Sequence, residues 1–269
     1  MKNILLASLV FATAAVFAQT TTPSVEEIVA KANIAAYYKG KDGRAKVSMS
    51  IKDAQGHERT REMTILRLDL EPADDTSDTF MGDQNFYVYF ERPADVNKTA
   101  YLVHKHIDTD DDRWLYLPGL NLVKRIAASD QRTSFVGSDF YYEDISGRGI
   151  TADTHELVET SDLYYVLENT PKDPKSVEFA SFKTWIHKTT FIPVSAKYYD
   201  AKGEVIREMT AAAVEEIQGY PTVTKAIMKD IRTGSTTTIS YTRVDYNTGL
   251  TEDLFTERYL RNPPRAKLR

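Results

Sequence analysis

The sequence of 269 residues carries 34 Lys and Arg against 39 Asp and Glu, a net charge of −5, and contains no cysteine. Hydrophobic residues make up 42% of the chain and charged residues 27%, a balance that excludes an intrinsically disordered chain. The lack of cysteine excludes disulfides, thiol nucleophiles and cysteine-ligated metals, and the negative net charge gives no support to nucleic-acid binding.

The N-terminal segment is typical of a secretory signal peptide. Lys2 precedes an apolar run over residues 4–17, shorter than the about 20 residues that a membrane-spanning helix needs. Val16 and Ala18 occupy the third and first positions before a cleavage site. The alternative interpretation of this segment is an N-terminal anchor helix.

The signal peptide sets the expected domain organisation. We expect residues 1–18 to be removed and residues 19–269 to form a single domain in a bacterial periplasm. No cysteine follows the cleavage site, so we expect a protein without a lipid anchor. A chain of this size can bury a sufficient core without disulfides.

A helix is predicted at the start of the domain. Ser24 and Glu27 form the S-x-x-E pattern of a capping box, and apolar residues follow at helical spacing. Gly40 provides a left-handed stop. The pattern predicts an amphipathic helix over residues 24–39, with an alanine-rich face that lies close over a sheet.

After this helix the apolar period changes from 3.6 to 2, which predicts short strands joined by turns. A short helix is expected at 251–260, before two prolines. The fold class is therefore mainly β (α+β), with an antiparallel sheet or barrel. The predicted strands are 46–52, 61–68, 86–90, 100–107, 114–117, 163–168, 181–188, 194–199, 205–209, 222–231 and 236–244.

Catalytic motifs are missing from the sequence, which has no G-x-S-x-G and no P-loop. Three potential zinc ligands, His104, His106 and Asp108, share one face of a predicted strand. A metal-dependent hydrolase is therefore an alternative, but polar surface is the favoured interpretation of these residues. We expect no enzyme, no catalytic residue, no cofactor and no bound metal.

Residues 113–145 concentrate aromatic side chains between charged ones. An apolar surface edged by a few charges is what a cavity for an amphiphile needs. The alternative is a sheet core with ion pairs on its outer face. The candidate cargo-binding residues are Trp114, Tyr116, Phe135, Phe140 and Tyr142. The candidate polar residues are Arg125, Asp139, Glu143 and Asp144, with Arg125 and Arg132 as partners for the three carboxylates.

The same stretch contains the motifs WLYLP at 114–118, VKRI at 123–126, SFVGSDF at 134–140 and YED at 142–144. These motifs resemble the signature of the LolA-like outer membrane lipoprotein-sorting protein family of exported bacterial proteins. The sequence departs from the family at Lys98, where glycine is frequent. The resemblance extends over essentially the whole predicted domain.

The resemblance implies a strongly curved antiparallel sheet that forms an incomplete barrel, closed by a few helices. It further implies a periplasmic chaperone that carries lipid, lipoprotein acyl chains or another hydrophobic cargo toward the outer membrane. The implied partners are the cargo, a resistance-nodulation-type (RND) exporter or an outer-membrane acceptor, with the carrier acting as a monomer. A sensor or adaptor that regulates a membrane partner is the alternative.

Overall fold

Antiparallel strands form one curved sheet in the computed structural model, which describes residues 22–71 and 81–269. The predicted signal peptide lies outside the described residues. The strands are β1 (Asp42–Lys52), β2 (Glu58–Asp69), β3 (Gln84–Arg92), β4 (Ala100–Lys105), β5 (Asp112–Leu117), β6 (Leu122–Ile126), β7 (Asp153–Thr160), β8 (Tyr164–Pro171), β9 (Ser181–His187), β10 (Pro193–Tyr199), β11 (Val205–Ile217), β12 (Tyr220–Asp230) and β13 (Ser235–Tyr246). Their order across the sheet is β6-β5-β4-β3-β2-β1-β13-β12-β11-β10-β9-β8-β7.

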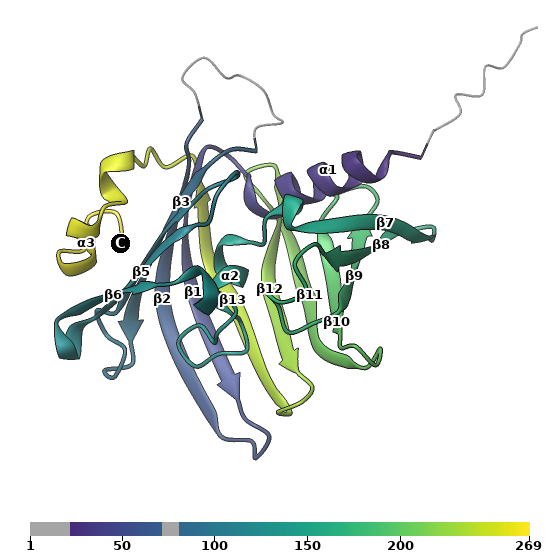
Figure 1. Ribbon diagram of the computed structural model, residues 1–269. Coiled ribbons are helices and arrows are strands. Elements are labelled where there is room, and N and C mark those ends of the chain that lie inside the picture. The colour runs from purple at the N-terminus through teal and green to yellow at the C-terminus, as the bar shows by residue number, and fades with distance from the viewer. Residues whose placement is uncertain (1–21, 72–80) are drawn as a thin grey trace, which may run out of the picture.

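The sheet is open, as Figure 1 shows. Its two edges are β6 and β7, which are consecutive in the chain but lie at opposite ends of the strand order. The connection between them, residues 127–152, therefore has to cross from one edge to the other. It carries the short helix α2 (Tyr142–Ser146) on the inner side of the curve. The predicted curved, incomplete barrel is confirmed.

The predicted first helix is α1 (Val25–Tyr37). The Ser24 side chain accepts a hydrogen bond of 3.1 Å from the backbone N–H of Glu27, as the capping pattern predicts. The Glu27 carboxylate pairs with Lys31 at 2.6 Å. Gly40 follows the helix at a φ of +64°. In Figure 1, α1 crosses the ends of the strands near β7 and β8.

Strand alternation divides the buried side chains between two faces of the sheet. On β3, Phe86, Val88 and Phe90 belong to the concave core, which also holds Phe135 from the 127–152 connection. Tyr87, between them, faces the convex side. There it packs with the C-terminal segment, which contains the 3₁₀ turn Glu252–Leu254 and α3 (Glu257–Arg261).

Two strands were not predicted from the sequence. β6 and β7 are the edge strands, and most of their side chains are exposed or half-buried. They therefore lack the apolar alternation that marks a strand with a buried face. The predicted helix over 251–260 is instead a 3₁₀ turn followed by the five-residue helix α3.

Candidate functional site: a cavity on the concave face

A cavity of about 450 Å³ lies between the concave face of the sheet, α1 and the connection that carries α2. Ligand sites in proteins typically enclose about 300–1,000 Å³, so this volume suits a small or elongated guest. Ala32, Ala35 and Ala36 of α1 line it. Their small side chains let the helix lie close to the sheet while leaving space beneath.

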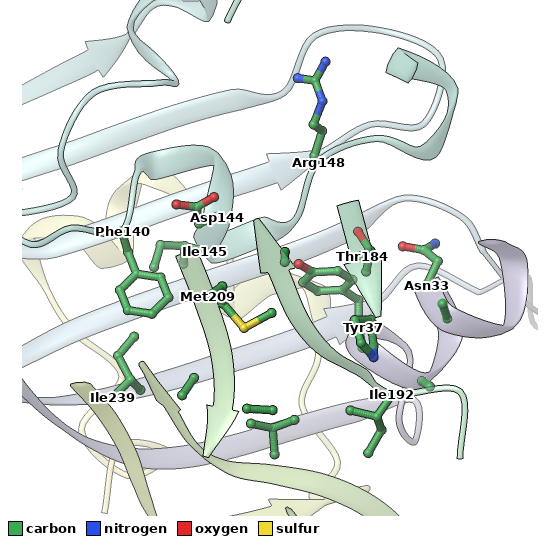
Figure 2. A pocket seen from close by; sticks show the side chains of 18 of the residues that line it. Asn33, Tyr37, Phe140, Asp144, Ile145, Arg148, Thr184, Ile192, Met209 and Ile239 are labelled. Carbon is green, nitrogen blue, oxygen red and sulfur yellow. The ribbon is translucent and has the colours of Figure 1, made fainter. Parts of the chain in front are cut away.

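The floor of the cavity is apolar and rich in methionine. Four of the six methionines of the chain line it: Met49, Met63, Met209 and Met228. Figure 2 shows Met209 with Phe140 and Ile239 around the same space. Methionine side chains are flexible and polarizable, so this surface can adapt to guests of different shape.

A buried ion-pair network fixes the α2 side of the cavity. The Arg132 guanidinium donates to Glu143 at 2.8 Å and to Glu178 at 2.7 Å, and Arg148 pairs with Asp153 at 2.9 Å. Burial alone lowers the pKa of Arg132, but its hydrogen bonds to Glu178 and the nearby carboxylates outweigh burial and raise that pKa. These groups are mutually satisfied, which favours a structural role for this network.

Arg207 of β11 connects this network to the sheet. Its side chain is fully buried, with the guanidinium 3.9 Å from the ring centre of Tyr141 and 5.3 Å from that of Tyr198. It donates to the Asp144 carboxylate and to the backbone carbonyl of Asp139. The α2 connection is thereby held against β11.

The candidate cargo-binding residues fall into three places. Phe140 lines the cavity. Phe135 and Tyr142 lie beside it in the concave core, where their ring centres are 5.6 Å apart. Trp114 and Tyr116 pack on the convex face with the C-terminal segment, because alternation along β5 turns them away from the cavity.

The candidate polar residues are likewise separated. Asp144 lines the cavity, and Glu143 is buried in the network of Arg132. The Asp139 carboxylate accepts from Thr237 at 2.7 Å and so ties the connection to β13. Arg125 is exposed and pairs with Asp112, not with any of the three carboxylates expected to be its partners.

Several residues of the site were missed by sequence reasoning. Arg148, Arg207 and Glu178 complete the ion-pair network, but they are far apart in the sequence and follow no motif. The methionines gave a weak signal, since all four lie on predicted strands.

The two histidines considered as zinc ligands have other partners. His104 Nε2 lies 2.7 Å from the carbonyl of Phe255, and His106 Nδ1 lies 2.8 Å from Asp83. The bond with Asp83 raises the pKa of His106. Within residues 22–71 and 81–269, no three His, Asp or Glu side chains are grouped so as to hold a metal ion. No helix in the same ranges is both long and apolar enough to span a membrane.

The fold is similar to that of a LolA superfamily protein from Nitrosomonas europaea, which is 21% identical and aligns with a TM-score of 0.66 over 88% of this chain and 100% of its own. Two solved structures with higher sequence identity show the family. A DUF1329 family protein from Desulfovibrio piger is 30% identical, with a TM-score of 0.77 over 89% of this chain and 100% of its own. A putative outer membrane lipoprotein-sorting protein domain from Vibrio parahaemolyticus is also 30% identical, with a TM-score of 0.76 over 87% and 97% of the two chains.

A family model described as an uncharacterized protein matches residues 82–262, more than half of the chain. A comparison with curated proteins found no match. The chain belongs to the LolA-like outer membrane lipoprotein-sorting protein family, as its motifs predict.

Proposed function

We propose that this protein is a periplasmic carrier that holds a lipid, a lipoprotein acyl chain or a similar hydrophobic cargo in its concave cavity. The observation that carries the proposal is the apolar, methionine-lined cavity of about 450 Å³ beneath α1. The lipoprotein-sorting name of the relative from Vibrio parahaemolyticus supports the same class of cargo. The carrier works without catalysing a reaction, as a monomer, after a signal peptide has directed its export.

The physical reason for a carrier is the cost of exposing an acyl chain to water. Burying each methylene is worth about 0.8 kcal/mol, so enclosing roughly ten of them contributes about 8 kcal/mol. Dispersion and hydrophobic contacts are non-directional, so the cargo can leave without breaking a fixed set of hydrogen bonds. This suits delivery to an outer-membrane acceptor or an RND-type exporter.

The residues that contact the cargo in this proposal are those that line the cavity. Of the aromatic candidates, Phe140 is the proposed contact residue, and Phe135 and Tyr142 hold it in place from behind. Asp144 is the polar candidate nearest the guest. Trp114 and Tyr116 stabilise the packing of the C-terminal segment on the convex face.

The test is native mass spectrometry of protein purified from the periplasm without detergent, followed by solvent extraction. We expect a lipid-sized mass that extraction removes, and uptake of a fluorescent acyl probe by the emptied protein. Protein without bound lipid that also fails to take up the probe contradicts the proposal. A stable complex with a membrane protein but no extractable cargo would instead support the sensor or adaptor alternative.

A further inference from the structure

The cavity wall contains cations as well as apolar side chains, and their partners differ. Among the described residues, the lysine and arginine side chains in the cavity wall are Lys39, Arg44, Arg67, Arg132 and Arg148. Arg132 and Arg148 are paired with carboxylates in the α2 network. Arg44 pairs with Asp245 at 2.9 Å. Arg67 also has oxygen partners, so four of these five cations are paired.

Arg67 caps the end of α1. Its guanidinium donates to the backbone carbonyls of Tyr37, Lys39 and Gly40, and it lies 3.4 Å from the Asp69 carboxylate. Positive charge at a helix C-terminus is favourable, because the last carbonyls of the helix have no partners within it. The positive charge of Arg67 is therefore already paired with oxygens of the protein itself.

Lys39 differs from the other four. The residue is only 9% exposed, and the hydrogen bonds and ion pairs found over residues 22–71 and 81–269 include none to its ammonium group. Burial and the neighbouring Arg67 lower the pKa of Lys39 to about 8, so the group is still mostly protonated at neutral pH. Partial burial weakens the hydration of this ammonium group, which is therefore expected to gain a partner when an anion is offered.

The position of Lys39 gives the cavity two different ends. It lies in the link between α1 and β1, where its carbonyl accepts from Arg67, and Arg67 pairs across the sheet with Gly43 at the start of β1. From Gly43, β1 runs to Met49 on the apolar floor, a length of about 20 Å at the usual rise of a strand. An elongated guest lying along β1 would have its tail among the methionines and its head at Lys39.

We infer that the cargo is an amphiphile with an anionic head, a carboxylate or a phosphate, which pairs with the Lys39 ammonium while its acyl tail lies on the methionine-lined floor. This inference rests on the proposed carrier function and specifies the chemical class of its cargo. Lys39 determines specificity in this arrangement, because an uncharged head would leave the ammonium without a partner.

The experiment compares two fluorescent probes that differ only in head charge, dansylaminoundecanoic acid and its methyl ester. The full protein is exported, purified and freed of lipid, and each probe is titrated into wild type and the variants Lys39→Met, Lys39→Arg and Lys41→Met. Lys41 is the matched control, since its side chain is 67% exposed and lies outside the cavity lining. Circular dichroism melts verify that Lys39→Met, which removes a buried charge, folds at least as stably as wild type.

We expect wild type to bind the acid about tenfold more tightly than the ester, the size of one charge-assisted hydrogen bond. Lys39→Met should lose that preference while its affinity for the ester is unchanged, and Lys39→Arg and Lys41→Met should keep it. Lipid extracted from wild type should carry a carboxylate or a phosphate, and its mass identifies which. Inorganic phosphate should not displace the probe.

Equal binding of acid and ester by wild type, or an undiminished preference in Lys39→Met, overturns the inference and leaves the carrier function standing. Displacement of the probe by inorganic phosphate also overturns it, because the site would then serve a free anion. Failure of wild type to bind either probe contradicts the carrier function itself.

Discussion

Gly147 follows α2 at a place where only glycine fits. Its φ of +83° and ψ of +145° lie in a region that residues with a Cβ rarely adopt. A Cβ added there would also lie 2.5 Å from Cζ of Tyr37 on α1, too close for van der Waals contact with the ring. Replacing Gly147 therefore forces a strained backbone, a displaced α1, or both.

The free-energy cost of Gly147→Ala can be estimated from these two causes. The backbone conformation costs about 1–3 kcal/mol, and forcing a methyl group against the ring costs a further roughly 1–3 kcal/mol. We expect the free energy of unfolding, measured by urea titration, to fall by about 2–6 kcal/mol. Gly149→Ala is the control, because Gly149 has a φ of −62° and open space around its Cβ position.

The two causes are separable in a double-mutant cycle with Tyr37→Leu, which removes the ring. In that background Gly147→Ala should cost only the backbone share. A Gly147→Ala protein within about 0.5 kcal/mol of wild type, or no more destabilised than Gly149→Ala, would refute the reasoning.

Three further predictions concern the cavity, the buried Asp69 carboxyl group and the hydrophobic core. Ala226→Phe, which fills the cavity from β12, should abolish uptake of an acyl probe, whereas the exposed Ala212→Phe on β11 should not; equal uptake by both would contradict the placement of the cargo site. Burial raises the pKa of Asp69 to about 6, above the about 3.9 of an unfolded chain, so its contribution to stability is present at pH 4 and is lost as the pH rises through 6. Urea titrations from pH 4 to 7 should show a loss of about 3 kcal/mol that Asp69→Asn removes, and an unchanged slope in the variant argues against the assignment. Phe135→Ala, at a fully buried site, should lower the free energy of unfolding by about 3–5 kcal/mol in the same assay, and a loss below about 1 kcal/mol would mean that this ring is not part of the core.

The central strands were predictable because each has one buried face. Strand β1 alternates between Val47, Met49 and Ile51 inside and polar residues outside, and such alternation is visible in a single sequence. The edge strands β6 and β7 were missed because most of their side chains are exposed or half-buried, and such strands do not show a clear alternation of apolar and polar residues. Their existence depends on a neighbouring strand that local sequence does not reveal.

The candidate site was predictable only in part, because the face on which a side chain lies depends on register. The motif region includes the connection whose Phe140 and Asp144 line the cavity. It also grouped Trp114 with them, although β5 turns that ring to the convex side. Lys39 gave no signal, since a lysine after a helix looks like ordinary surface until the surrounding strands bury it.

The pairing of β1 with β13 has a consequence for how the molecule forms. Met49 and Ile239, which are partners in the middle of the sheet, lie near opposite ends of the described chain. Contacts so distant in sequence close late, because the entropy of the long loop has to be overcome first, and they slow folding. The centre of the sheet, and with it the floor of the cavity, cannot be completed until β13, near the C-terminal end of the described chain, is available to pair with β1. The cavity is therefore among the last parts of the molecule to form, because its floor needs strands from near both ends of the described chain.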